Sequence, residues 1–381
     1  MAVFLGAVIV MTALGLSLNH LFLGVKASSD NMYKIGDKQV LLDTSAPSVA
    51  GGRVDQTPDG PGVKTIVMAY ACIGEKPLAQ VIIPAFKDYW MQKTGEKVRF
   101  ITSYGVPDNF DTIASTAMGK PVQVLLMNSG TDAINRGFSY TKWDETENKG
   151  VVYTYPQVFL VRKGNPKNIK SYADLARSDV QLLHVTPVGK TTGTWAVYGI
   201  FGSALKRTEK ESGNKNYDEA LLFLKEVERN AINDIDLVTE AERDFAGGLG
   251  DVVMISESRA QKQAKTKKYE VVYPPNTIEG EMIVYKNLAN ISDDQTAVVD
   301  AFIDFLFGEL AQDAFAKATL RPTDPAVLAK YPGFVEVQDP VHVDYLGTPT
   351  EVKKKLIVDN WPEVDANSIS QADPNNLANN P

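Results

Sequence analysis

Apolar runs alternate with amphipathic stretches through most of the chain, from about residue 64 to about residue 330. Strands are predicted at residues 65–71, 98–103 and 122–127. The run at residues 158–161 is uninterrupted, which is typical of a strand that is buried on both faces. The pattern therefore indicates a series of buried strands rather than a helical bundle.

Helices are predicted between the first strands. One has Pro77 near its start and Gly95 just past its end, and the next covers residues 110–118. Such a strand–helix–strand series forms an open, largely parallel sheet. Ligands of these sheets bind beyond the C-terminal ends of the strands, so the loops there are the place to look for a site.

The stretch from residue 155 to residue 195 has the clearest local pattern. Its strand is followed by a turn at residues 164–166 and by a short helix, which Ser171 and Asp174 begin in the manner of a capping box. A second strand at residues 182–185 leads to a Lys-Thr-Thr-Gly-Thr loop, which opens a helix toward Lys206. Free backbone N–H groups and the dipole at such a helix start attract an oxyanion.

Later helices follow the same rules. An amphipathic helix is predicted at residues 218–230, and Ser292 with Gln295 forms a capping box for a helix that runs through Phe307. Gly308 then interrupts the chain before a helix at residues 311–318. A terminal amphipathic helix at residues 348–358 could pack on its own domain or on a neighbouring molecule, and packing on its own domain is favoured.

The 155–195 stretch resembles the sulfate/thiosulfate-binding proteins, which are extracytoplasmic receptors of ABC importers. The matching motifs, in chain order, are Lys163-Gly164-Asn165-Pro166-Lys167, Asp174-Leu175, Pro187, Lys190-Thr191-Thr192-Gly193 and Trp195. Weaker matches extend from about residue 64 to about residue 330, including Gly250-Asp251-Val252 and Leu320-Arg321-Pro322. The resemblance implies an α/β fold with two lobes, the type 2 periplasmic-binding-protein fold, here preceded by an N-terminal hydrophobic helix.

The expected domain organisation follows from the resemblance and from composition. Residues 28–63 are rich in Ser, Gly, Pro and Asp and are typical of a linker, or of an extended arm laid on a partner. The predicted segments are 1–27 (signal peptide or transmembrane anchor), 28–63 (linker or arm), 64–155 (first part of lobe 1), 156–255 (lobe 2), 256–330 (return to lobe 1) and 331–381 (C-terminal helix and tail).

The resemblance also implies where a ligand would bind. The family's ligand loops follow the strand ends of both lobes and offer hydroxyl and backbone N–H donors. The corresponding ligand-binding residues here are Ser103, Gly105, Thr192, Gly193, Thr194 and Ser256.

Several of the family's ligand positions are changed in this chain. Ala71 stands where the family has Asp, and Pro107, which has no N–H, stands where the family offers an amide. Ser256 replaces a tryptophan donor. Losing two charge-assisted hydrogen bonds of about 1.5 to 3 kcal/mol each would weaken binding by roughly two to four decades. The sequence thus leaves two alternatives, a changed ligand or a binding fold kept for another task.

Composition excludes several other classes of function. The net charge is −8 with scattered basic residues, which does not suit a nucleic-acid partner. Cys72 is the single cysteine and there are three histidines, so neither a disulfide nor a metal site is expected, and no cofactor is expected. His184 is interpreted as a strand residue packed near the core. No catalytic motif is present, and Glu240, Glu242 and Asp244 are interpreted as a solvated helix face, so an enzyme is rejected.

The N-terminal residues 2–25 contain no charge and are long enough, as a helix of roughly 36 Å, to cross a bilayer. Residues 25–27 also offer the small-residue spacing of a signal-peptidase site, so a cleaved signal peptide and an uncleaved anchor both fit. Either segment, together with the resemblance, predicts a location on the periplasmic side of a bacterial inner membrane.

Two hypotheses for function follow. The first is a solute-binding protein that holds a small sulfate-like oxyanion between two lobes and delivers it to an ABC transporter permease. The second is a membrane-anchored accessory subunit of a larger integral membrane complex, respiratory or photosynthetic, that kept the fold and lost tight ligand binding.

Overall fold

The computed structural model of the chain describes residues 31–45, 50–105, 114–129, 133–134, 137–145 and 149–365. The hydrophobic helix predicted within residues 1–27 and the tail beyond residue 365 lie outside these ranges. Within the described ranges, no helix combines the length and the apolar character that a membrane span requires.

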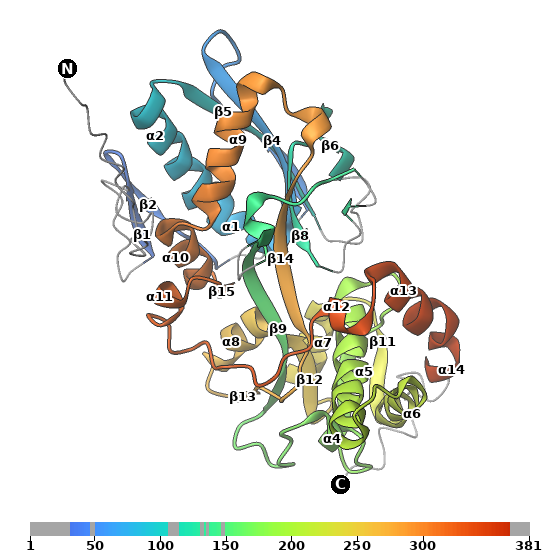
Figure 1. Cartoon of the computed structure of the whole chain (residues 1–381). Helices are drawn as coiled ribbons and strands as arrows, with labels where there is room; N and C mark the ends of the chain where they lie inside the picture. The colour runs from blue at the N-terminus through green and yellow to red at the C-terminus, as the bar shows by residue number, and fades with distance from the viewer. Residues whose placement is uncertain are drawn as a thin grey trace, which may run out of the picture.

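Two lobes share one mixed sheet of eleven strands among the described residues (Figure 1). The sheet order is β11-β10-β12-β9-β14-β8-β4-β5-β3, and β13 and β15 pair with β9 beside this path. The strands are β3 (Gly51–Val54), β4 (Val63–Ala71), β5 (Lys97–Gly105), β8 (Val124–Asn128), β9 (Val151–Arg162), β10 (Leu182–Val185), β11 (Ala231–Ile235), β12 (Val252–Ser256), β13 (Tyr269–Val272), β14 (Glu279–Lys286) and β15 (Arg321–Pro322).

The predicted α/β architecture with parallel strands in each lobe is confirmed. In lobe 1, β4 pairs in parallel with both β5 and β8. In lobe 2, β10 pairs in parallel with both β11 and β12. The C-terminal ends of the parallel strands therefore collect on one edge of each lobe, where a ligand is expected.

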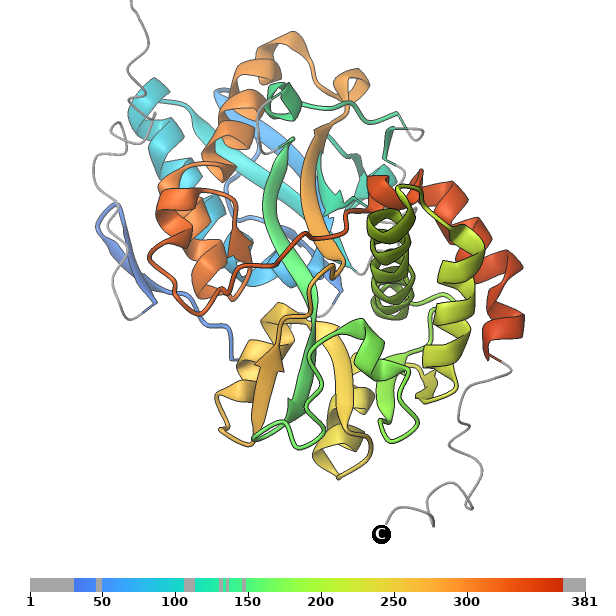
Figure 2. The same ribbon diagram turned by 60° about the horizontal axis from the view of Figure 1, so that its bottom comes forward.

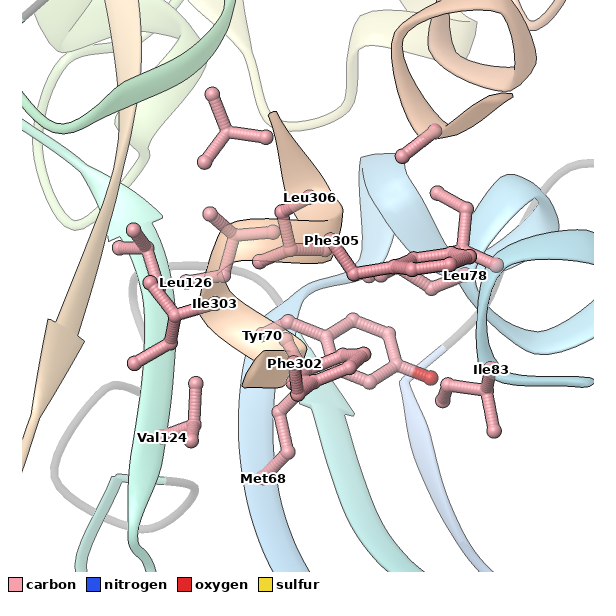
Figure 3. Close-up of a cluster of buried hydrophobic side chains, with 14 of the residues drawn as sticks. Met68, Tyr70, Leu78, Ile83, Val124, Leu126, Phe302, Ile303, Phe305 and Leu306 are labelled. Carbon is pink, nitrogen blue, oxygen red and sulfur yellow. The ribbon is translucent and has the colours of Figure 1, made fainter. Parts of the chain in front are cut away.

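Helices α2 (Ile83–Thr94) and α9 (Asp293–Leu306) cover the lobe 1 sheet. Figure 3 shows their contact with the sheet, where Phe302 and Ile303 of α9 lie against Met68 and Leu126. These side chains are almost fully buried. Gly95 ends α2 in the left-handed conformation, as its position in the sequence predicted.

Lobe 2 has helices on both faces of its strands. Helices α5 (Thr191–Ser212) and α6 (Tyr217–Glu228) pack on one face, and α7 (Val238–Ala246) and α8 (Glu257–Ala264) pack on the other. The predicted terminal helix is present as α13 (Pro349–Lys353), continued by a π-helical turn. It packs on lobe 2 beside α5 and α6, so the predicted docking on its own chain is confirmed (Figure 2).

Strand β9 carries the chain from one lobe to the other. Its residues 153 and 154 pair with β14 and β15 of lobe 1, whereas residues 157–161 pair with β12 of lobe 2. We call residues 155–157 of β9 and the strand ends around them the lobe boundary. Because the strand is continuous here, the predicted domain limit near residue 155 stays a prediction. Helix α8 and strand β13 pack on lobe 2, whereas the prediction placed residues 256–330 in lobe 1.

The segment that was predicted as a linker or partner-bound arm packs on lobe 1 instead. Strands β1 (Met32–Ile35) and β2 (Lys38–Leu41) form a hairpin beside α2 and α10 (Glu309–Lys317), and β3 adds an antiparallel edge strand to β5 (Figure 1). Tyr33 is fully buried in the lobe 1 core. Apolar side chains at the alternating positions of β1 outweigh the Gly- and Pro-rich composition around them.

One predicted helix is wrong in its C-terminal part. Residues 116–118 were expected to be helical, but β6 (Thr116–Ala117) pairs with β7 (Lys120–Pro121). Met118 and Gly119 both have positive φ, which makes the tight turn of this hairpin and ends any helix before it. Residues 110–113 of the same prediction lie outside the described ranges.

Candidate functional site

The start of α5 approaches the end of β10 as closely as a backbone allows. A Cβ atom placed on Gly193 would lie 2.2 Å from the carbonyl oxygens of both Val185 and Thr186. Only glycine fits there, and it lets the first turn of the helix sit directly beyond the strand. The N–H groups of Thr192 and Gly193 belong to this first turn, where a helix offers no internal acceptor.

Thr194 has a different role from the one predicted. Its backbone N–H donates to the carbonyl oxygen of Lys190 over 3.0 Å, which is the first hydrogen bond of the helix. Its hydroxyl donates to the carbonyl oxygens of Lys190 and Pro187, at 3.0 and 3.2 Å. Both donors are therefore bound within their own loop, and Thr194 holds the helix start in shape.

The predicted residues of lobe 1 lie at the end of β5. Ser103 pairs with Ala69 and Gly105 pairs with Ala71 in the parallel β4–β5 register, so both stand beside the end of β4. Ser103 is buried, with 9% of its surface exposed. Pro107, the residue expected to lack a donor, lies outside the described ranges.

Ser256 ends β12 and precedes α8, and it pairs with Gln157 of β9. The predicted site residues thus fall into a lobe 1 group at the end of β5 and a lobe 2 group at the starts of α5 and α8. The contacts that relate the two groups come from the crossing strand β9.

Tyr155 contacts both lobes, and sequence reasoning missed it. Its hydroxyl is hydrogen-bonded with Asn128, the last residue of β8 in lobe 1. Its ring lies 6.0 Å, centroid to centroid, from that of Trp195 in the first turns of α5 in lobe 2. Burial raises the pKa of the Tyr155 hydroxyl well above its ordinary value, so it stays protonated and available as a donor.

Gln157 supplies a second polar group at the lobe boundary. The side chain is 2% exposed, and its Oε1 atom has no hydrogen-bond partner among the described residues. An unpaired buried amide oxygen costs free energy, which a bound donor or water would recover. The sequence offers no local pattern that would have distinguished Gln157 from the apolar residues around it.

Three arginine–glutamate pairs also surround the lobe boundary, each with a shortest N–O distance of 2.6 Å. The pairs are Arg53 with Glu75, Arg259 with Glu242, and Arg321 with Glu257. Glu242 was expected on a solvated face, but its side chain is 11% exposed because the Arg259 guanidinium covers it. Burial raises the pKa of Glu257, and the Arg321 guanidinium opposes that effect.

Among the described residues, no group of three or more His, Cys, Asp or Glu side chains could hold a metal ion. His184 lies on β10 with no exposed surface, as predicted for a core strand residue. Its Nε2 atom lies 3.1 Å from both carboxylate oxygens of Glu228, and Asn233 donates to the same carboxylate. This buried cluster belongs to the lobe 2 core rather than to the lobe boundary.

Two α/β lobes joined by crossing strands, with helix starts and strand ends at the edge of each lobe, are typical of two-lobed binding proteins. A family model described as bacterial extracellular solute-binding protein matches residues 72–321. The chain belongs to this family of bacterial extracellular solute-binding proteins.

Two relatives indicate which kind of solute-binding protein this chain resembles. The chain is 27% identical over 297 residues to a sulfate-binding protein of Synechococcus elongatus, covering 75% of this chain and 82% of that protein. It is 28% identical over 257 residues to a thiosulfate-binding protein of Pseudomonas aeruginosa, covering 65% and 75% of the two chains. The protein is therefore a solute-binding protein homologous to sulfate- and thiosulfate-binding proteins.

Solved structures agree with this fold. The sulfate-binding protein SubI from Mycobacterium tuberculosis H37Rv matches with a TM-score of 0.58 and 25% identity, covering 77% of this chain and 99% of that chain. A structure described as an ABC transporter from Clostridium perfringens shares the fold with a TM-score of 0.60 and 14% identity, over 78% of this chain and 99% of that one. These findings give no support to the second hypothesis, an accessory subunit of a membrane complex.

Proposed function

We propose that the protein binds a small tetrahedral oxyanion, of the sulfate or thiosulfate kind, at the lobe boundary. The observation that carries this proposal is the contact of Gly193 with the end of β10, which presents the N–H groups at the start of α5 beyond the strand. A helix start with free N–H groups is a natural anion site. The names of the curated relatives support the same ligand class.

The binding groups would come from both lobes. Thr192 and Gly193 would donate from α5, while Ser103 and Gly105 would donate from the end of β5. Ser256 would donate from the start of α8. The Ser256 side chain makes no capping hydrogen bond with the start of α8, so a ligand would not compete with a helix cap for its hydroxyl.

Binding would bring the lobes together around the anion. The donors of the two lobes belong to different parts of one sheet, and β9 and β14 connect those parts, so small changes in the crossing strands would move one group toward the other. The bound oxyanion would then be passed to the permease of an ABC importer, on the outer side of the cytoplasmic membrane. The role is one of binding and delivery, without chemistry on the ligand.

Isothermal titration calorimetry of the purified protein with sulfate, thiosulfate, molybdate, tungstate and phosphate tests the ligand class. At least one of these anions is expected to bind, and the melting temperature should rise with the logarithm of its concentration above Kd. Thr192→Val is the matched variant, since it removes a hydroxyl and keeps the shape of the side chain. Absence of both binding heat and thermal shift for all five anions would refute the proposal.

A further inference from the structure

The edge strand β3 brings a guanidinium to the lobe 1 side of the lobe boundary. Arg53 is held by the antiparallel pairing of β3 with β5, in which it stands opposite Thr102, next to Ser103. Its Nη2 atom lies 2.6 Å from Oε1 of Glu75, and its guanidinium also bonds to the Tyr104 hydroxyl. The side chain keeps 52% of its surface exposed, so it is anchored at one end and still open to solvent.

Glu75 is an unusual residue to find at this point. It opens α1 (Glu75–Pro77), after the 3-10 turn Cys72–Gly74 that follows β4, and its side chain is only 3% exposed. A carboxylate buried this deeply needs a partner, and Arg53 and Lys76 supply positive charge at 2.6 and 3.6 Å. Glu75 thus holds Arg53 beside the strand ends that carry Ser103 and Gly105.

Lobe 2 contributes a second guanidinium. Arg259 lies in the first turn of α8, three residues after Ser256, and pairs with Glu242 of α7. Its charge acts across the boundary on Cys72 of lobe 1, where burial raises the pKa of the thiol and Arg259 opposes that rise. The geometry of β9 agrees with this placement, because Gln157 pairs with Ser256 just before α8 and the Tyr153 hydroxyl faces Gly74 just before Glu75.

A buried hydroxyl without a partner lies at the same place. Tyr153 has no exposed surface, and its hydroxyl makes no hydrogen bond among the described residues. A Cβ on Gly74 would lie 2.9 Å from that hydroxyl, so the group is directed at the short segment between Cys72 and Glu75. A buried donor left unpaired at this position indicates that something else completes its hydrogen bonding.

We propose that Arg53 and Arg259 form a cationic subsite of the lobe boundary, in which one guanidinium from each lobe contacts the bound oxyanion. This inference rests on the proposed function and adds charged ligand residues to it. Guanidinium groups match the paired oxygens of a tetrahedral oxyanion and compensate for two family donors, the amide N–H that Pro107 lacks and the indole N–H that Ser256 replaces. Glu75 and Glu242 position the two arginines and compete with the anion for them.

Substitution of the arginines tests the subsite. Arg53→Ala and Arg259→Ala are each expected to weaken the Kd of the best anion of the five by about ten- to a hundred-fold. Arg207→Ala is the matched control, because Arg207 pairs with Glu219 over 3.4 Å near the far end of α5, roughly 24 Å along the helix from its start. The control should bind like the unaltered protein.

Glu75 variants separate binding from folding. Arg53→Ala alone leaves a buried carboxylate unpaired, so Arg53→Ala/Glu75→Gln is made beside Glu75→Gln, and the melting temperature of each is recorded. Glu75→Gln should tighten anion binding several-fold, since it frees Arg53 from its carboxylate partner. The double variant should bind the anion more weakly than Glu75→Gln and more weakly than the unaltered protein. Anion binding that is as tight in the double variant as in Glu75→Gln would overturn the role of Arg53.

Ionic strength gives an independent measurement. With two guanidinium contacts, anion affinity should fall steeply between about 0.01 and 1 M monovalent salt, and Arg53→Ala/Arg259→Ala should flatten that dependence. If the unaltered protein binds an anion and the Kd of either single arginine variant differs from it by less than twofold, the subsite is refuted and the proposed function stays intact. Failure of the unaltered protein to bind any of the five anions refutes the proposed function itself.

Discussion

Gly193 shows how much of a binding site can depend on one absent side chain. Its Cα faces two backbone carbonyl oxygens, which cannot move aside as a flexible side chain would. Gly193→Ala should therefore displace the first turn of α5, lower the free energy of unfolding by about 3 kcal/mol and abolish anion binding. Urea denaturation and calorimetry measure the two effects.

Gly333 provides the comparison for that substitution. An added Cβ there would meet nothing within 4 Å. Gly333→Ala should leave the unfolding free energy within about 0.5 kcal/mol and the anion Kd unchanged. Equal behaviour of the two alanine variants would show that the close approach at Gly193 does not control the site.

His184 and Glu228 predict a pH-dependent stability of lobe 2. Burial disfavours the charged imidazole, but the adjacent Glu228 carboxylate outweighs it, so the pKa of His184 is raised above its ordinary 6.5. A raised pKa in the folded state means that the stabilisation is complete below the unfolded pKa and is lost as pH rises through the folded value. The contribution should fall above pH 6.5, by at most about 1.4 kcal/mol per pH unit for one proton.

The measurement is the difference in unfolding free energy between the unaltered protein and His184→Gln/Glu228→Gln, taken at intervals from about pH 6 to pH 9. The double variant replaces the pair by two amides and avoids leaving one charge buried alone. The difference should shrink as the pH rises. His342, whose pKa the Glu281 side chain also raises, is present in both proteins and cancels. A difference that grows with pH would contradict the assigned charge pair.

At the scale of elements, local signals in the sequence were reliable where the reason for a structure was itself local. The Ser171–Asp174 and Ser292–Gln295 capping boxes form as predicted, and each backbone N–H of the serine donates to the partner side chain. A helix opening at the Lys190–Thr194 loop was also predicted, and α5 begins there at Thr191. Caps and apolar runs act within a few residues, so the sequence alone contains them.

Elements that depend on distant partners were not predicted. Strand β3 has a Gly-rich sequence and all four residues exposed, and it becomes a strand because β5 offers an edge. Its pairing decides where Arg53 lies, so the Arg53–Glu75 contact could not be foreseen from composition. Tyr155 and Gln157 were missed for a similar reason, since their importance comes from the crossing of β9 between lobes.

Tyr33 tests whether the N-terminal hairpin is an integral part of lobe 1. Its ring is fully buried, its hydroxyl donates to Asp313 over 2.8 Å, and the Lys317 ammonium lies 4.5 Å from the ring centroid. Tyr33→Ala should cost about 3 to 5 kcal/mol of unfolding free energy, as other buried aromatic truncations do. Tyr33→Phe should lower the unfolding free energy by only about 1 kcal/mol, because the Asp313 carboxylate still has the Tyr331 hydroxyl and the Lys317 ammonium as partners. A loss below about 1 kcal/mol in Tyr33→Ala would mean that the hairpin is merely attached to the surface.

At the scale of the whole molecule, the two lobes and their order along the chain followed from the family resemblance, whereas the connection between them came from the structure. Arg321 of β15 in lobe 1 makes two contacts with Glu257 of α8 in lobe 2, at 2.6 and 3.2 Å. Beside it, the hydroxyls of Ser258 and Thr319 lie 2.8 Å apart. These contacts join the start of α8 to lobe 1, so the buried ion pair limits how far the two lobes can separate.

Removing one partner of this pair should therefore affect the whole molecule. Arg321→Met leaves Glu257 buried without its cation, which costs about 3 to 5 kcal/mol, while Arg321→Met/Glu257→Gln should recover most of that loss.

Because the pair couples the lobes, the single variant should also unfold with a broader transition and a lower denaturant slope, as expected when two units separate before they unfold. Denaturation followed by tryptophan fluorescence and by circular dichroism should then give two midpoints for Arg321→Met, since Trp90 lies in lobe 1 whereas Trp195 and Trp361 lie in lobe 2. Coincident curves with an unchanged slope would show that β9 and β14 alone keep the lobes cooperative and that the Arg321–Glu257 pair contributes only to local stability.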